Sequence, residues 1–141
     1  MTTRSEVVAL LGLSPHPEGG WFRETWRDDG SGGQRGSGTA IYYLLGKGER
    51  SHWHRIDATE VWHFYAGDAL DLALSAEGTE VQHTLLGPAV EEGHRPQLVV
   101  PAGTWQSAVT VGAWSLVGCT VSPAFDFDGF ELAPPGWSPG A

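Results

Sequence analysis

Residues 46–67 contain the densest group of histidine, carboxylate and basic side chains in the chain, and their types and spacing suit a metal site. His52 and His54 are two positions apart, so within a strand both side chains project from the same face. Two neutral imidazoles joined by a carboxylate from a neighbouring strand are the usual ligands for Fe, Mn, Ni or Zn. Glu60, at the start of the next expected strand, supplies that carboxylate. The pattern therefore predicts a divalent metal ion held by His52, His54 and Glu60.

The strand that begins near Glu60 decides which of its own side chains share that site. In a regular strand, Trp62 and Phe64 lie on the face of Glu60, whereas His63 lies on the opposite face. Glu60 and His63 do not look into one cavity unless a bulge intervenes. We therefore assign Glu60 to the site. His63 is either a histidine on the outer face of the sheet or a general acid or base.

Aromatic and cationic side chains crowd the same strands, as they do in pockets for small organic ligands. Trp53, Trp62 and Phe64 are candidate walls of such a pocket, although ordinary core packing also explains each of them. Arg55 stands at the strand end nearest the site. It either clamps an anionic group of a ligand or pairs with acidic residues at the surface.

Two features outside this stretch also have more than one interpretation. His16 and Glu18 precede two glycines, and they either line the mouth of the pocket or only belong to a glycine-rich turn. Cys119 lies in an apolar run, where a buried small side chain is more usual than a nucleophile.

Short strands separated by tight turns must position these side chains. The 20 glycines and nine prolines, with seven tryptophans, are typical of an all-β chain. One helix is expected over residues 5–13, with Ser5 as its N-cap and Gly12 near its end. So many strands at this spacing predict a jelly roll or a closed barrel. The expected strands are 20–27, 39–45, 51–55, 60–65, 70–74, 81–86, 97–100, 104–109 and 114–121.

The chain has room for one domain, which we place over residues 1–133. Residues 28–38 are polar and rich in glycine, so we expect a flexible, hairpin-like connection there. The segment 125–132 is a candidate last strand. Residues 134–141 are rich in proline and glycine and are expected to fray.

Composition argues against several classes of partner. The net charge is −9 and Lys47 is the only lysine, whereas binding to nucleic acid needs clustered basic residues. No apolar run approaches the roughly 20 residues that cross a bilayer. A single cysteine rules out an internal disulfide. We expect a cytoplasmic protein that binds neither nucleic acid nor a membrane.

Five positions of the polar stretch resemble the first sequence motif of the cupin superfamily. The matching residues are Gly46, His52, His54, Glu60 and Gly67. Five residues separate His54 from Glu60, where the family pattern has three or four. The second cupin motif is matched in part, because Pro101 and Gly103 fit it but Gln106 stands where a third histidine is usual.

Further strings resemble a narrower group, the small cupins catalogued as a family of unknown function. They lie at residues 15–20, 51–55, 60–67, 100–106 and 116–121. The resemblance implies a single double-stranded β-helix, the cupin jelly-roll barrel, with a short N-terminal helix. It also implies a homodimer, and it implies no particular reaction.

The leading hypothesis is a metal-dependent enzyme that acts on a small polar organic molecule, as an isomerase, a lyase or a dioxygenase. Gln106 is a candidate fourth ligand through its amide oxygen. His54, Glu60 and Tyr43 are the candidate catalytic residues. The candidate substrate contacts are Trp53, Arg55, Trp62, Phe64 and Gln106.

Two alternatives keep the barrel without a metal. The first resembles the sugar-epimerase cupins, with His54 or His63 as the base and Tyr43 or Tyr65 as the proton donor. The second is a non-catalytic module that binds a small ligand or a carbohydrate.

Overall fold

The computed structural model describes residues 2–140, which form short strands around one α-helix, α1 (Arg4–Leu11). The strands are β1 (Ser14–Pro15), β2 (Trp21–Arg27), β3 (Thr39–Gly46), β4 (Ser51–Ile56), β5 (Thr59–Gly67), β6 (Leu70–Ser75), β7 (Gln82–Leu86), β8 (Gln97–Val100), β9 (Trp105–Thr110), β10 (Trp114–Ser122) and β11 (Phe130–Leu132). Two 3₁₀ turns complete the described elements, η1 (Val90–Glu92) and η2 (Phe127–Gly129). All nine strands expected over residues 20–121 are present, with ends that agree to within two residues. The candidate last strand, 125–132, is shorter than expected, because the η2 turn occupies part of it and β11 begins only at Phe130.

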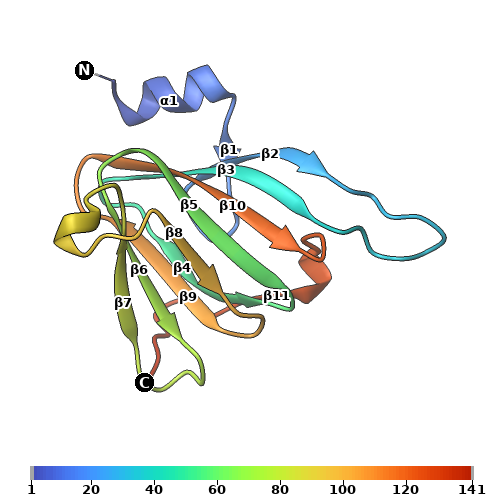
Figure 1. Ribbon diagram of the computed structural model, residues 1–141. Coiled ribbons are helices and arrows are strands. Elements are labelled where there is room, and N and C mark those ends of the chain that lie inside the picture. Colours follow the sequence, from blue (N-terminus) through green and yellow to red (C-terminus); the bar gives the residue numbers. More distant parts are fainter. Residues whose placement is uncertain (1, 141) are drawn as a thin grey trace.

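The strands form two facing antiparallel sheets (Figure 1). One sheet has six strands in the order β1-β2-β3-β10-β5-β8, and the other has five in the order β11-β4-β9-β6-β7. Strands that are distant along the chain, such as β3 and β10, are therefore neighbours. This crossed connectivity is that of a jelly roll, and it confirms the all-β class and the cupin-type barrel.

Alternation along the strands explains which faces meet. In β6, Leu70 and Leu72 point inward and are fully buried, while Asp71 between them points outward and lies beside His83 of β7. Burying the apolar face of each sheet against the other builds the apolar core. Its buried members are Tyr43, Leu45, Trp62, Leu70, Leu72, Leu86, Val100, Ala108, Val117 and Cys119.

Helix α1 covers the outer face of the six-stranded sheet. The Thr3 hydroxyl accepts a hydrogen bond from the backbone N–H of Glu6, so the N-cap is Thr3 and not Ser5. Gly12 ends the helix in the left-handed conformation, with φ of 66°. Val7 packs against Leu44 of β3, which fixes the helix on the sheet. None of the helical segments in residues 2–140 is long and apolar enough to cross a bilayer.

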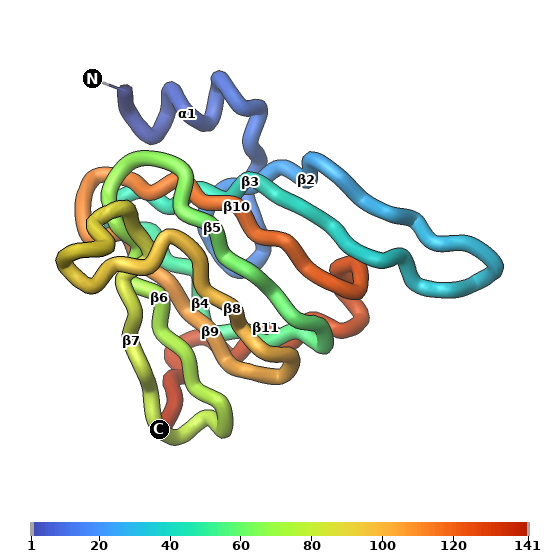
Figure 2. The backbone as a smooth tube through the Cα atoms, in the orientation of Figure 1, coloured from blue at the N-terminus to red at the C-terminus, as the bar shows by residue number. Residues whose placement is uncertain are grey.

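The connection between β2 and β3 reaches out beyond the body of the sandwich (Figure 2). The two strands pair as a hairpin, as expected, from Trp21 opposite Leu44 to Arg27 opposite Thr39. Asp28 ties the loop, because its carboxylate accepts hydrogen bonds from the backbone N–H groups of Gly30 and Ser37 at 3.0 and 2.8 Å.

The C-terminal tail packs on the five-stranded sheet, whereas its composition predicts fraying. The Trp137 ring lies 4.6 Å from that of Trp105 and 6.3 Å from that of Trp53, measured between ring centroids. The backbone N–H of Gly140 donates to Gly78 at 2.9 Å. One large aromatic side chain is enough to anchor a segment whose other residues are mostly proline, glycine and serine.

Candidate active site

The polar site begins with a bulge in β4. Ser51 lies opposite Ala108 of β9, and His54 lies opposite Gln106, so three steps along β4 correspond to two along β9. The extra residue shifts the alternation. Ser51 and His54 consequently both face the barrel interior, where their side chains are buried.

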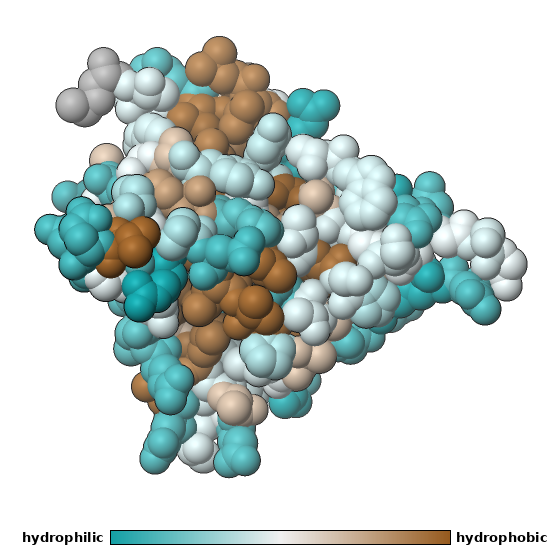
Figure 3. All heavy atoms as spheres, in the orientation of Figure 1, coloured by the Kyte–Doolittle hydropathy of each residue, from teal (hydrophilic) through white to brown (hydrophobic). Residues whose placement is uncertain are grey.

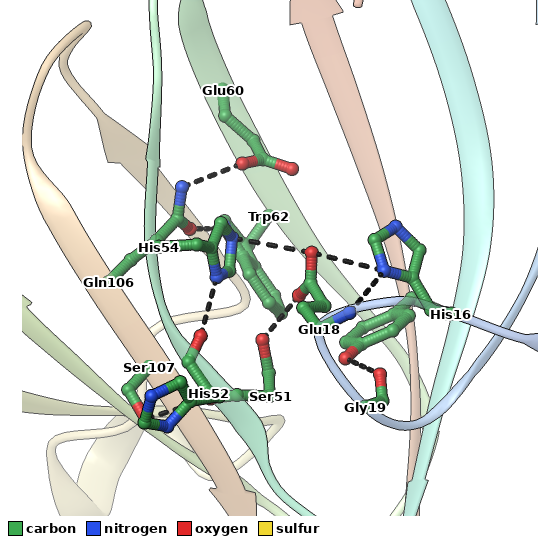
Figure 4. Close-up of polar contacts among 11 residues, drawn as sticks. His16, Glu18, Gly19, Ser51, His52, His54, Glu60, Trp62, Gln106 and Ser107 are labelled. Atoms are coloured by element: carbon green, nitrogen blue, oxygen red, sulfur yellow. Dashed lines mark hydrogen bonds and ion pairs between the residues drawn. The ribbon is translucent and has the colours of Figure 1, made fainter. Parts of the chain in front are cut away.

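The same bulge turns His52 away from the interior, which corrects the expectation that it shares a face with His54. Its Nε2 lies 3.0 Å from the carbonyl oxygen of Pro134 in the C-terminal tail. Figure 4 shows its ring on the opposite side of the strand from that of His54. The regular alternation on which the expectation rested does not hold across a bulge.

The loop between β1 and β2 brings Glu18 and His16 into the barrel. The backbone N–H of His52 donates to the carbonyl of Glu18 at 2.8 Å, which ties this loop to β4. Gly19 has a φ of 109°, and a Cβ there would lie 2.0 Å from the carbonyl oxygen of Arg50. Only glycine allows this close approach. The glycine-rich turn is therefore what places Glu18 inside.

Glu18 lies between two imidazoles. Its Oε1 lies 3.4 Å from Nε2 of His54 and 3.4 Å from Nδ1 of His16, and its Oε2 accepts a hydrogen bond from the Ser51 hydroxyl (Figure 4). His16 Nδ1 also accepts from the backbone N–H of Glu18 at 3.1 Å. This contact leaves the Nε2–H of a neutral His16 free to donate elsewhere.

A second chain of hydrogen bonds leads to Glu60. The Trp62 indole N–H donates to Oε1 of Gln106 at 2.8 Å, and Nε2 of Gln106 donates to Oε1 of Glu60 at 2.8 Å. All three side chains are buried. The indole donates only, so it fixes the orientation of the Gln106 amide. Gln106 consequently presents its N–H, and not its oxygen, to Glu60.

Burial dominates the protonation of these groups. Loss of hydration raises the pKa of Glu60 from 4.5 to about 7, although the nearby His54 acts in the opposite direction. The pKa of Glu18 is also raised by burial, against the influence of His16. Burial lowers the pKa of both His54 and His16 below 6.5. At neutral pH the two imidazoles are neutral, and Glu60 exists in both of its protonation states.

These side chains line a cavity of about 60 Å³ between the sheets, which suits a group of a few atoms. Its polar floor is formed by His16, Glu18, His54 and Glu60. Its apolar walls and mouth include Phe22, Ile41, Tyr43, Ile56, Trp62, Cys119, Val121, Phe125 and Phe127. Glu24, Arg27 and Thr39 complete the lining. His54, Glu60, Tyr43 and Trp62 therefore meet at one cavity.

The expected metal ligands do not converge. His52 points out of the barrel, and the amide oxygen of Gln106 is occupied by the Trp62 indole N–H. Of the four expected ligands, only His54 and Glu60 reach the cavity. Across residues 2–140, no group of three or more histidine, cysteine, aspartate and glutamate side chains is placed to hold a metal ion. The expected ligand set does not fit a metal.

Three expected substrate contacts also lie away from the cavity. Arg55 is on the outside of β4, where its guanidinium pairs with Glu131 at 2.8 Å and lies 4.5 Å from the Trp105 ring centroid. Trp53 is buried under the tail, and Phe64 packs against the apolar core. In a regular strand Ser51, Trp53 and Arg55 would share one face. The bulge in β4 separates Ser51, which points inward, from Trp53 and Arg55, which point outward.

His63 lies on the outer face of β5, the first of its two interpretations. Its Nε2 is 3.0 Å from the hydroxyl oxygen of Thr120 on β10, and its ring stacks on that of Tyr65. The alternation of β5 thus places His63 and Glu60 on opposite faces. His63 takes no part in the cavity.

His16 and Glu18 are the main members of the site that sequence reasoning leaves open. Their only signal is the pair of glycines that follows them, which permits a turn tight enough to enter the barrel. Nothing in the local sequence indicates the depth to which the loop enters.

The chain matches one family model and resembles several solved structures. The family model described as Cupin superfamily (DUF985) matches residues 5–133. A solved protein from Shewanella oneidensis is 38% identical, with a TM-score of 0.89, over 94% of this chain and 85% of its own. A hypothetical protein from Leishmania major is 32% identical, with a TM-score of 0.85, over 94% of this chain and 88% of its own.

A more distant structure shares the fold alone. A dTDP sugar isomerase from Desulfovibrio desulfuricans is 15% identical, with a TM-score of 0.62, over 88% of each chain. A search of curated proteins gives no match.

Proposed function

The chain belongs to the cupin superfamily, in its family of unknown function DUF985, and from this premise we propose that it is an enzyme that transfers protons on a small polar organic molecule. The observation that carries the proposal is the meeting of His16, Glu18, His54 and Glu60 around one buried cavity. Perturbed acids and bases gathered in a cleft are typical of catalytic sites. The reaction class is an isomerisation, an epimerisation or an elimination.

His54 is the proposed base. Its Nδ1 donates to the carbonyl oxygen of His52 at 2.8 Å, which fixes the tautomer and leaves the lone pair of Nε2 free. Nε2 is on the side of the ring that faces Glu18. Burial keeps the ring neutral at pH 7, the form that accepts a proton.

Glu60 is the proposed acid. Its pKa of about 7 lets it hold a proton at neutral pH and still release it readily. Nε2 of His54 takes a proton from a carbon next to a carbonyl group, while Glu60 gives its proton to the carbonyl oxygen. The resulting enol returns to a carbonyl compound when a proton is delivered back to carbon and the oxygen returns its proton to Glu60.

Tyr43 is proposed as a positioning residue, and not as the proton donor expected from the sequence. Its hydroxyl donates to the carbonyl oxygen of Gly19 at 2.5 Å and so holds the loop that carries Glu18. Burial raises the pKa of Tyr43 well above its ordinary value of 10, which makes it a poor source of protons at neutral pH.

A metal-dependent reaction at this cavity is the alternative that the cupin resemblance favours. Its expected ligands are His52, His54, Glu60 and Gln106, and two of them face elsewhere or are already hydrogen-bonded. Measurement of the metal content of protein purified without a histidine tag decides between the two proposals. A stoichiometric metal that is lost on His54→Ala would replace the metal-free proposal.

The expected homodimer and cytoplasmic location stay proposals. Apolar side chains gather over α1 and over the sheet on the face seen in Figure 3. Independently of that view, Leu10 of α1, Tyr65 of β5 and Val99 of β8 are large hydrophobic residues with exposed side chains. Such side chains offer apolar area that a second copy of the chain would cover.

Exchange of a compound's carbon-bound hydrogen for deuterium from the solvent tests the proposed function. The protein is incubated in D₂O with a panel of small hydroxy- and amino-carbonyl compounds, and loss of C–H signal is followed by ¹H NMR. We expect exchange that falls about 100-fold or more in His54→Gln. His63→Gln is the matched control, because His63 lies on the outer face of the sheet, and it should exchange at the wild-type rate. Exchange that is equal in the two variants, or absent for every compound, would overturn the proposal.

A further inference from the structure

Acidic side chains outnumber basic ones around the cavity. Glu18 and Glu60 form part of its floor, and Glu24 lies in its lining. Arg27 is the single lysine or arginine among the lining residues. Its guanidinium is already paired with Glu24 through two hydrogen bonds, at 2.8 and 2.9 Å. No unpaired cation of the lining is left to meet an anionic ligand.

The other arginines near this end of the barrel are also occupied outside it. Arg35 forms a bidentate pair with Asp57, at 2.9 and 3.1 Å, and Arg55 pairs with Glu131 at 2.8 Å. Phosphate and carboxylate groups are recognised in proteins by free arginine or lysine side chains. The lining therefore offers such groups no free lysine or arginine side chain, and the Nε2–H of a neutral His16 is an uncharged donor.

The floor instead offers acceptors. Gln106 donates to Oε1 of Glu60, the Cys119 thiol lies within hydrogen-bonding reach of the same carboxyl group, and both Glu60 and Cys119 line the cavity. Nε2 of His54 carries a lone pair, because its Nδ1–H is used by a backbone carbonyl. A ligand N–H group can donate to the Glu60 carboxylate, whereas a carboxylate oxygen would be repelled by Glu60 whenever that group is ionised.

The mouth adds aromatic faces. Phe125 and Phe127 stand 4.8 Å apart at ring centroids, and Phe127 is 53% exposed although it lines the cavity. The negative face of an aromatic ring attracts a cation. The overall charge of −9 acts in the same direction at longer range.

We propose that the cavity selects a neutral or positively charged nitrogen group, such as an amidine, an amine or an amide, and rejects carboxylate and phosphate groups. This inference rests on the proposed function, since it names the substrate class of the same site. Glu60 is its specificity-determining residue, and the group that binds beside it is limited to a few atoms by the cavity volume of about 60 Å³.

Three molecules of one shape and different charge test the inference. Acetamidinium, acetamide and acetate have the same number of non-hydrogen atoms and are positive, neutral and negative at pH 8. Their binding is followed by ¹H–¹⁵N NMR titration of the full chain. We expect acetamidinium to bind at least ~10-fold more tightly than acetate, with acetamide between them. Acetate that binds as tightly as acetamidinium, or no shift of cavity residues with any of the three, would overturn the inference.

Two variants locate the effect. Glu60→Gln should bring the affinities of acetamidinium and acetate within about 3-fold of each other, because it removes the negative charge without changing the shape. Glu131→Gln removes a carboxylate from the outer surface and should keep the wild-type ratio. An unchanged ratio in Glu60→Gln would contradict the assignment, provided that its NMR spectrum shows a folded chain.

The two proposals fail separately. If acetamidinium is preferred and no carbonyl compound exchanges its C–H protons, the protein is a binding module and the inferred ligand class stands. If exchange is found and acetate is preferred, the proton-transfer function stands and the inferred ligand class is wrong.

Discussion

Oε1 of Glu18 lies 3.4 Å from Nε2 of His54 inside the barrel, although the two residues come from a loop and from a strand. The loop before β2 thus supplies half of the polar floor, and the bulge in β4 supplies the imidazole that meets it. The two local irregularities, a glycine-dependent turn and an inserted residue, together make the site.

Glu60→Gln should change the pH dependence of stability. The folded pKa of about 7 exceeds the ordinary 4.5, so the folded chain holds a proton that the unfolded chain releases between these values. This favourable contribution of Glu60 is complete below pH 4.5 and is lost as the pH rises through 7. The variant should therefore gain up to about 3 kcal/mol over wild type between pH 4 and pH 8.

Urea unfolding at several pH values measures this difference. Glu131→Gln, at an exposed ion pair, is the control and should track wild type within about 0.5 kcal/mol. A constant difference between Glu60→Gln and wild type across the pH range would show that Glu60 titrates normally.

Gln106→Leu should destabilise the fold by about 2–4 kcal/mol. It leaves the buried indole N–H of Trp62 and one oxygen of Glu60 without partners. Gln97→Leu is the control, because Gln97 is exposed and makes one long contact of 3.4 Å with His63. Equal unfolding free energies for the two variants would mean that the Trp62–Gln106–Glu60 chain of hydrogen bonds is not formed.

His52→Ala should leave the rate of C–H exchange with D₂O within about 2-fold of wild type. The metal content of the purified protein should also be unchanged. Its imidazole contacts the tail at Pro134 and does not face the cavity. A change of one outward side chain leaves the geometry of a buried site intact. Loss of activity together with loss of a bound metal, measured by elemental analysis, would restore His52 as a ligand.

Trp137→Ala should lower the unfolding free energy by about 1–3 kcal/mol, because its ring packs on those of Trp53 and Trp105. The measurement is urea unfolding followed by circular dichroism. Phe127→Ala, at an aromatic ring that is 53% exposed, is the comparison and should cost less. A tryptophan variant as stable as wild type would mean that the tail is frayed in solution.

The sequence predicts the strands well because each is a short segment with aromatic, β-branched or alternating apolar residues between turn residues. It also identifies His54 and Glu60, since strand position and residue type are enough to place them beside an interior cavity. It fails at His52, because the bulge depends on how β4 pairs with β9, a contact between distant segments. The position of Glu18 is equally hard to predict, because its loop is held by distant residues: it approaches the carbonyl of Arg50, just before β4, and bonds to the backbone N–H of His52.

The protonation of Glu60 is the property on which the proton-transfer account depends. Selective ¹³C labelling of glutamate side chains lets each carboxyl group be titrated by NMR, with Glu60→Gln identifying the signal of Glu60. We predict a midpoint near pH 7, far above that of the exposed glutamates. A midpoint near the ordinary value of 4.5 would contradict the account, since Glu60 would then carry no proton to give at neutral pH.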